Sequence, residues 1–384
     1  MQIKITNNFS EWASQDKYLE TLTVTRQTVK DKHTKNQIRG LRSLGMTSSS
    51  LALLYGMMRN DYETGYALFS KIRFLCWYWD NGDKIIFPLN SRNMLYIGND
   101  SIDWCSHWPF FREIEEKTYE CQLREFNYHL NYVSEYPLLG IGGQSHFGHF
   151  VANKVAALYQ SALAYPYLSS LESLLVPDDY IDLHKSILES VLKGKKNHYV
   201  LPRINGIHSF HNIVIPCIDE HSNAITGLKG VIEKQTLDRQ TVSGKRIYIT
   251  RADGKKNDRI MDYAIFCNRL AELDYQIINP LGHSFDERLS LIGDSELILT
   301  DPGSCALNGL LFGNIKSILK CMIPKRVISS VQCTIINQLC LGFDQGLSNQ
   351  WLPLESYNHN PFNPWYDILK PPAKEYLVTL SSSA

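Results

Sequence analysis

Two arginines in the C-terminal half of the chain have the chemistry and the placement to hold a phosphate. Arg251 directly follows an expected strand over residues 246–250, and Arg259 lies a short distance further along. A guanidinium binds two oxygens at once and keeps its charge, and ligands of open α/β sheets bind at the carboxyl ends of the strands. We therefore predict that Arg251 and Arg259 clamp a phosphate-bearing ligand. The alternative for each is an exposed loop arginine paired with Asp253 or Asp258.

The loop Asp301-Pro302-Gly303-Ser304 follows a second expected strand and precedes an expected helix. Gly303 would let the backbone approach a ligand closely, and Ser304 would cap the helix or bind a phosphate oxygen. The N-terminus of a helix carries free N–H groups and a partial positive charge, which suits an anion. A plain helix cap is the alternative. No GxGxxG follows a strand and no GxxxxGK[ST] occurs, which disfavours dinucleotide enzymes and P-loop NTPases.

His149 is the first candidate for a general base. It follows the glycine-containing segment 142–148 and is expected in the first turn of a helix. An imidazole, with an unperturbed pKa of about 6.5, can accept a proton near neutral pH. A structural histidine is the alternative. Neither HExxH nor Asp-x-Asp occurs, so the sequence predicts no metal site.

These candidate residues need a scaffold of alternating strands and helices. Helices are expected over 151–176 and 180–193, and again after 250. Short apolar runs predict strands at 85–87, 94–97, 138–141, 212–215, 246–250, 275–278 and 296–300. Strands that alternate with helices in two successive blocks favour an α/β protein with two sheets.

The N-terminal region has a different pattern. Apolar residues recur at helical spacing across 41–58, and a second stripe consists of Tyr66, Phe69, Ile72 and Leu75. We predict a helical N-terminal arm over 1–83, an N-terminal α/β domain over 84–240, a C-terminal α/β domain over 241–345 and a tail over 346–384. The tail is expected to pack back on the protein, with one short helix near 366–369.

Composition narrows the class of protein. The chain has 384 residues, and Lys+Arg 39 equals Asp+Glu 39, so it is not tuned to nucleic acid or to an anionic membrane. Its nine cysteines include no CxxC pair, which favours a reducing compartment over a disulfide framework. No run of about 18 apolar residues occurs. The expected protein is cytoplasmic, with at most peripheral contact at the inner face of a membrane.

Two blocks of sequence resemble glycosyltransferase family 61. The segment Phe147-Gly148-His149-Phe150 is similar to that family's N-[FY]-x-H-[FW] motif. Residues 246–308 resemble its C-terminal signature, in which a strand ending in SR precedes a spaced second Arg, SFxEQ, a strand and an HGAG-L-x-N loop. The matching positions, with Ser304 in place of the Ala, are Arg251, Arg259, Ser284, Phe285, Glu287, Gly303 and Asn308. The resemblance covers roughly residues 140–315.

The resemblance implies two Rossmann-like domains of the GT-B type and an inverting transfer from a nucleotide sugar without an essential metal. His149 would be the catalytic base, and the other matched residues would bind the donor. Three departures stand out. Pro302 replaces the His of many members, Arg288 replaces the usual Gln, and Thr250 replaces the Ser before Arg251.

We therefore expect an inverting glycosyltransferase that builds a surface polysaccharide such as capsule or lipopolysaccharide. Its substrates would be a nucleotide sugar, expected to be UDP-linked, and a glycan acceptor, with no separate cofactor. The first alternative is a non-catalytic nucleotide- or glycan-binding scaffold with a decayed transferase domain. The second is another nucleotide-using α/β enzyme, such as a sugar epimerase or kinase. The sequence makes no prediction of oligomeric state.

Overall fold

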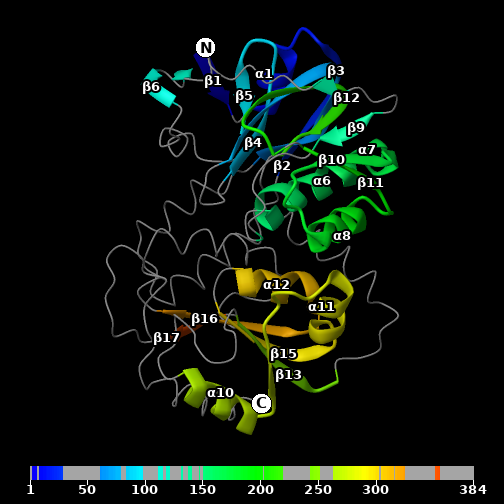
Figure 1. The fold of residues 1–384 in the computed structure, drawn as a ribbon. Helices are drawn as coiled ribbons and strands as arrows, with labels where there is room; N and C mark the ends of the chain where they lie inside the picture. Colours follow the sequence, from blue (N-terminus) through cyan, green and yellow to red (C-terminus); the bar gives the residue numbers. More distant parts are fainter. Residues whose placement is uncertain are drawn as a thin grey trace. The chain divides into compact units, whose positions relative to one another are not determined.

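The computed structural model divides into two units, each described separately below (Figure 1). Unit 1 contains the described residues up to 218, and unit 2 contains those from 243 onward. The described residues are 2–6, 8–28, 61–78, 84–97, 111–115, 118–121, 131–132, 137–140, 147, 150–201, 203–218, 243–250, 263–301, 304–314, 316–324 and 351–354.

The described strands of unit 1 form one mixed sheet of twelve strands in the order β11-β10-β9-β12-β3-β4-β5-β1-β7-β6, with β2 beside β3 and β8 beside β12. The strands are β1 (Gln2–Thr6), β2 (Leu19–Thr28), β3 (Asp61–Tyr78), β4 (Lys84–Leu89), β5 (Met94–Tyr96), β6 (Phe111–Glu115), β7 (Thr118–Cys121), β8 (Asn131–Tyr132), β9 (Leu138–Gly140), β10 (Ser173–Val176), β11 (Asn197–Val200) and β12 (Gly206–Pro216). Strands β11, β10, β9 and β12 are parallel, whereas β3 is antiparallel to β12, β2 and β4.

Helices connect the parallel strands of unit 1. The π-helix η2 (Phe150–Val155), α6 (Ala156–Ala164) and α7 (Tyr167–Ser170) lie between β9 and β10 in the chain, and α8 (Asp182–Val191) lies between β10 and β11. The strands predicted at 85–87, 94–97, 138–141 and 212–215 are confirmed as β4, β5, β9 and β12.

The helix predicted over 151–176 is wrong at its C-terminal end. Its last residues form β10, all four of which are buried. A short apolar run buried on both faces is typical of a parallel strand, and periodicity alone does not distinguish it from a buried helix. The helix predicted over 180–193 is confirmed as α8.

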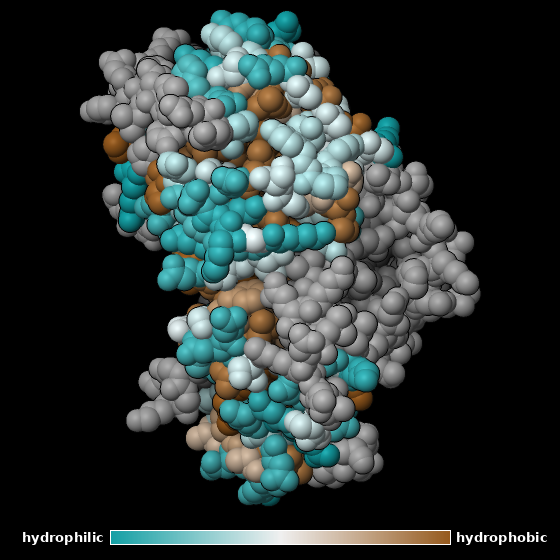
Figure 2. All heavy atoms as spheres, turned by 90° about the vertical axis from the view of Figure 1, so that its right-hand side faces the viewer, coloured by the Kyte–Doolittle hydropathy of each residue, from teal (hydrophilic) through white to brown (hydrophobic). Residues whose placement is uncertain are grey.

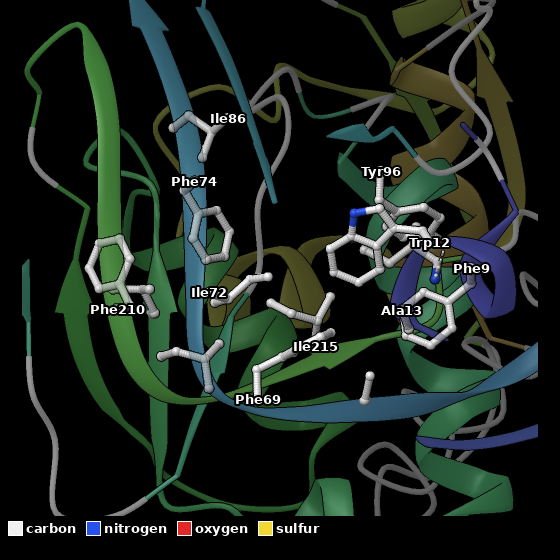
Figure 3. Close-up of a cluster of buried hydrophobic side chains, with 14 of the residues drawn as sticks. Phe9, Trp12, Ala13, Phe69, Ile72, Phe74, Ile86, Tyr96, Phe210 and Ile215 are labelled. Atoms are coloured by element: carbon white, nitrogen blue, oxygen red, sulfur yellow. Dashed lines mark hydrogen bonds between the residues drawn. The ribbon is translucent and has the colours of Figure 1, made fainter. Parts of the chain in front are cut away.

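The helical stripe predicted across 66–75 is also wrong, because these residues lie within β3. Burial alternates along β3 but changes phase between Phe69 and Ile72, both of which are buried. That change of phase produces a spacing of three and imitates a helix. Figure 3 shows β3 bending sharply in this region. The other predicted helical stretch, 41–58, lies outside the described residues.

Aromatic side chains fill the core of unit 1 beside β3. Helix α1 (Phe9–Ser14) buries Phe9 and Trp12 completely or nearly so, and Figure 3 shows both beside Tyr96. The Trp12 ring lies 5.3 Å from the rings of Phe69 and Tyr96, and its Nε1 donates to the carbonyl oxygen of Met94 at 2.9 Å. This bond satisfies the polar atom of the indole, so the largest side chain of the cluster is buried without an unpaired donor.

The described strands of unit 2 form a five-stranded parallel sheet in the order β14-β13-β15-β16-β17. Along the chain, the elements are β13 (Lys245–Ile249), α10 (Tyr263–Glu272), β14 (Tyr275–Ile278), α11 (Phe285–Ile292), β15 (Ser295–Thr300), α12 (Ser304–Phe312), β16 (Ile318–Pro324) and β17 (Trp351–Leu354). Each of the first three strands is followed by a helix, and the helices predicted after residue 250 and after the loop 301–304 are confirmed as α10 and α12. The strands predicted at 246–250, 275–278 and 296–300 are confirmed, and so is the α/β class.

Helices cover both faces of the unit 2 sheet. Figure 1 shows α11 and α12 on one face and α10 on the other. Helix α12 is apolar and packs closely on the strands, since a Cβ atom added at Gly309 would lie 2.7 Å from Leu319 Cδ1 and 3.2 Å from Ile298 Cγ2. The absence of a side chain at Gly309 therefore sets how near α12 lies to the sheet.

The surface of the described residues mixes polar and apolar side chains. Figure 2 shows hydrophobic residues interspersed with hydrophilic ones on the face that it draws. Exposed apolar residues such as Ile181, Val200 and Leu281 are ordinary features of a protein surface when they occur singly. Among the helices that the structure describes, none is long and apolar enough to cross a membrane.

Candidate functional site

The carboxyl ends of β13 and β15 form the point in unit 2 where the strand order changes direction. The chain passes from β13 to β14 on one side and later returns to β15 on the other side of β13. Helices α10 and α12, which follow β13 and β15, lie on opposite faces (Figure 1). Open α/β sheets bind ligands at such a switch point, because the two connections leave the edge in opposite directions.

Asp301 is the centre of a buried hydrogen-bond network at this edge. Its side chain is only 3% exposed, and its Oδ1 accepts from the Tyr248 hydroxyl at 2.6 Å. Its Oδ2 accepts from the Thr250 hydroxyl at 2.9 Å. Its backbone N–H donates to the Ile249 carbonyl oxygen at 3.2 Å. The side chain of one strand end is thus joined to two side chains of the neighbouring strand end.

Burial keeps the Tyr248 hydroxyl of this network protonated. Burial raises the pKa of Tyr248 well above its ordinary value, and the nearby Asp301 carboxylate raises it further. Burial also raises the pKa of Tyr263, which packs in the same cluster as Tyr248 on the α10 face. Tyr248 therefore acts as a hydrogen-bond donor to Asp301 at neutral pH.

Asn308 and Arg288 join α12 to α11. The Arg288 Nη1 donates to the Asn308 Oδ1, and the Arg288 Nε donates to the His283 carbonyl oxygen at 3.0 Å. The Asn308 Nδ2 donates to the Ser304 carbonyl oxygen at 2.8 Å. Burial lowers the pKa of Arg288 to about 10, an effect that the nearby Cys305 opposes, so the guanidinium remains charged at neutral pH. Asn308, a predicted donor-binding residue, is 2% exposed and occupied by these contacts.

Ser284 and Glu287 form a capping box at the start of α11. The Glu287 N–H donates to the Ser284 Oγ at 3.3 Å, and the Ser284 N–H donates to the Glu287 Oε2 at 2.7 Å. Both residues satisfy free N–H groups of the first helical turn. Phe285 is 8% exposed and lies edge-on to Phe312, with 5.5 Å between the ring centroids. These three predicted donor-binding residues thus build the N-terminus of α11 and its contact with α12.

The remaining predicted site residues lie outside the described residues. These are His149, Arg251, Arg259 and Gly303. Two of them are chain neighbours of described positions in the site: Arg251 follows Thr250, and Gly303 precedes Ser304, the first residue of α12. His149 precedes Phe150, the first residue of η2.

Neither Asp301 nor Tyr248 is a site residue that the sequence predicts. The sequence did contain a signal, since Tyr248 and Thr250 alternate at the end of β13 and Asp301 directly follows β15, the other strand of the switch point. Arg288 was noticed as a departure from a motif, but its bond to Asn308 was not predicted. The hydrogen bonds of Asp301 and of Arg288 each join side chains from different elements, and the spacing of residues along the chain does not reveal such contacts.

The fold and this edge define an α/β protein with a doubly wound parallel sheet in unit 2. No protein-family model and no curated protein sequence matches the chain.

Proposed function

We propose that this protein is an inverting, metal-independent glycosyltransferase that moves a sugar from a nucleotide-sugar donor to a glycan acceptor in surface polysaccharide synthesis. In this proposal both units are Rossmann-like domains of the GT-B type, and unit 2 binds the nucleotide. The donor is proposed to be UDP-linked.

The observation that carries the proposal is the adjacency of Thr250 and Asp301 at the switch point of unit 2. Ile249 and Thr300 pair in neighbouring parallel strands, and the side chains of Thr250 and Asp301 are hydrogen-bonded. Arg251 and Gly303 are within two residues of these positions along the chain. The described neighbours of two phosphate-binding candidates, one from each motif, therefore lie at one edge of one sheet, which supports a joint use of these candidates on one ligand.

The proposed reaction is a single displacement at the anomeric carbon. His149 would accept the proton of the acceptor hydroxyl as that oxygen forms the new bond. The bond from the anomeric carbon to the diphosphate would break, and Arg251, Arg259 and the N-terminus of α12 would stabilise the departing negative charge. Ser284 and Glu287 would support this indirectly, by fixing the start of α11 next to α12.

Arg251→Ala tests the proposal when it is compared with a matched control. Arg269→Ala removes an exposed arginine of α10 that pairs with Glu272, so it changes the charge of unit 2 equally. Thermal unfolding would be measured with UDP, GDP, CMP and their sugar conjugates. Selective stabilisation of the wild type by one nucleotide class is expected, since saturation with ligand raises the unfolding free energy by about 2.7 kcal/mol at 100 times Kd.

The expected result is that Arg251→Ala folds normally, loses the nucleotide-dependent shift and loses transfer, whereas Arg269→Ala keeps all three properties. Wild-type-like transfer by Arg251→Ala would contradict the assigned role. No shift of the wild type with any nucleotide would contradict the proposed function itself.

A non-catalytic nucleotide- or glycan-binding scaffold is the second candidate. It is favoured by the contacts of Ser284, Phe285, Glu287 and Asn308, which are all engaged in holding α11 and α12. The two candidates differ in turnover. Release of nucleoside diphosphate from the bound donor, with acceptor glycans present, supports the enzyme, and saturable binding without release supports the scaffold.

A further inference from the structure

We propose that unit 1 contains a binding site for a small oxyanionic group, a phosphate or a carboxylate, in a pocket lined by Lys17, Lys71 and Arg73. The pocket has a volume of about 220 Å³. Its lining comes from the α1–β2 connection, from β3, and from the end of β4 with the turn that follows it. The lining residues are Asp16, Lys17, Tyr18, Lys71, Ile72, Arg73, Leu89 and Ser91.

The walls of the pocket are fixed to one another by hydrogen bonds. The buried Asp16 carboxylate accepts from the backbone N–H of Tyr18 and from that of Ser91, each at 2.7 Å. The Lys17 N–H donates to the Ser91 Oγ at 3.0 Å, and the Ser70 N–H donates to the Tyr18 carbonyl oxygen at 3.0 Å. Three separate segments are therefore held together around the pocket before any ligand binds.

Positive charge exceeds negative charge in this pocket. Lys17, Lys71 and Arg73 are the cations, and Asp16 is the carboxylate that lines it. Both oxygens of Asp16 are engaged by backbone N–H groups, and within the described residues neither lysine forms an ion pair. The arrangement leaves the two ammonium groups available to an external anion.

Both lysine ammonium groups lie near the ring of Tyr18. The Nζ atoms of Lys17 and Lys71 lie 4.8 Å and 6.0 Å from the centroid of the Tyr18 ring. A tyrosine ring attracts cations through its quadrupole, and this attraction partly offsets the repulsion between the like charges. An oxyanion in the pocket that both lysines line would offset that repulsion more strongly, because it carries a full opposite charge.

Arg73 supplies a third cation to the lining of the pocket, and its guanidinium is held by hydrogen bonds. Its Nη2 donates to the Asn93 Oδ1 at 3.0 Å and to the Asn90 carbonyl oxygen. Burial lowers its pKa and Asp16 opposes that shift, but an arginine remains charged near neutral pH. Its position costs little further conformational entropy when an anion arrives, which favours a specific site over a diffuse basic surface.

The size of the pocket restricts the ligand. Drug-sized ligands occupy pockets of roughly 300–1,000 Å³, so this site fits a smaller body such as a single phosphate or one acidic sugar residue. All residues that line the pocket belong to unit 1, so anion binding there is independent of nucleotide binding by unit 2.

Calorimetric titration of the full chain with sodium phosphate, sodium glucuronate and neutral glucose, all at constant ionic strength, tests this site. Lys71→Met keeps the apolar stem and removes the charge, and Lys17→Met with Lys71→Met removes both ammonium groups. Lys195→Met is the matched control, since Lys195 is an exposed lysine of unit 1 that pairs with Glu189 outside the pocket. Unchanged thermal unfolding would verify that each variant folds.

Saturable binding of phosphate or glucuronate, but not glucose, is expected for the wild type. Lys71→Met should weaken it at least about tenfold, as for the loss of one charge-assisted hydrogen bond, and the double variant should abolish it. Tighter binding of phosphate would identify a phosphate as the source of the oxyanion, and tighter binding of glucuronate a sugar carboxylate. The proposal is overturned if neither anion binds saturably, or if glucose binds as tightly as the anions. It is also overturned if Lys195→Met weakens anion binding as much as Lys71→Met does.

Discussion

The sheets of the two units carry their candidate polar side chains at different positions along the strands. In unit 2 the strands are parallel, and the buried polar network gathers at the carboxyl edge around Asp301. In unit 1 the long strand β3 is antiparallel to its neighbours, and its polar residues Lys71 and Arg73 line a pocket along the strand itself.

The difference follows from which faces of each sheet are covered. A parallel sheet with helices on both faces buries most of its strand residues, so buried polar side chains collect where the strands end. An antiparallel strand can have one face in the core and the other toward solvent. Ile72 of β3 is buried with the aromatic core, whereas its neighbours Lys71 and Arg73 lie partly exposed. Polar side chains that could bind a ligand are therefore expected at the strand ends in unit 2, and also on the faces of strands in unit 1.

Trp12→Ala should have the largest effect on stability, because it removes the largest side chain from the aromatic core of unit 1. We expect a loss of about 3–5 kcal/mol in the free energy of unfolding, from lost burial and the cavity left behind. The Met94 carbonyl oxygen also loses its indole donor. Urea-induced unfolding measures the change, and Trp12→Phe, which retains a ring, should lose less. Equal stability of Trp12→Ala and the wild type would show that this cluster does not stabilise unit 1.

Asp301→Ala should have the next largest effect, since it removes the acceptor for two buried hydroxyl groups. We expect a loss of about 2 kcal/mol, because Tyr248 and Thr250 are then left without this partner in the interior. Tyr248→Phe alone should cost less, and a double-mutant cycle by urea unfolding should give a clear coupling energy between Tyr248 and Asp301. Strict additivity of the two changes would mean that the hydrogen bond between Tyr248 and Asp301 contributes nothing to the free energy of unfolding.

The sheet of unit 2 was largely predictable from sequence because its strands are short apolar runs separated by helices. The type of each of these elements is evident from its own residues, as it is for the strands at 275–278 and 296–300. The same logic failed for β3, whose change of inward face between Phe69 and Ile72 imitates helical spacing. It also failed at 173–176, where a buried strand follows helices without a break in hydrophobicity. The spacing of hydrophobic residues along the chain does not show which strands will pair with one another through backbone hydrogen bonds.

The candidate site was predictable to a lesser extent. The loop 301–304 was recognised as the start of a helix, and the structure begins α12 at Ser304. The capping box was implicit in Ser284 and Glu287, which have the spacing of that motif. The bonds of Asp301 to Tyr248 and of Arg288 to Asn308 were not predictable, because each joins side chains that only the folded sheet and helices bring together.

Arg288→Gln should have a smaller effect than Asp301→Ala. A glutamine is shorter than an arginine, so it cannot reach the His283 carbonyl oxygen and the Asn308 side chain together. We expect a loss of about 1 kcal/mol in the free energy of unfolding, since the carboxamide retains part of the hydrogen bonding. Arg269→Gln, an exposed change of the same kind on α10, is the control for urea unfolding. A loss larger than that of Asp301→Ala would indicate that the link between α11 and α12 contributes more to the stability of unit 2 than the hydrogen bonds of Asp301 do.

Glu287→Gln should have the smallest effect, and its dependence on pH distinguishes a charge effect from a packing effect. Backbone and side-chain hydrogen bonds with Ser284 lower the pKa of Glu287 below its ordinary value of 4.5. A carboxyl group with a lowered pKa in the folded state adds stability above the unfolded pKa and loses it as the pH falls through the folded pKa. The wild type should therefore unfold at a higher temperature than Glu287→Gln near pH 7, and this difference should disappear as the pH falls below about 4.5. Thermal unfolding across this range provides the measurement, with Glu296→Gln on β15 as the control of equal charge. A difference in melting temperature that persists unchanged in acid would assign the effect to hydrogen-bond geometry rather than to the charge at the N-terminus of α11.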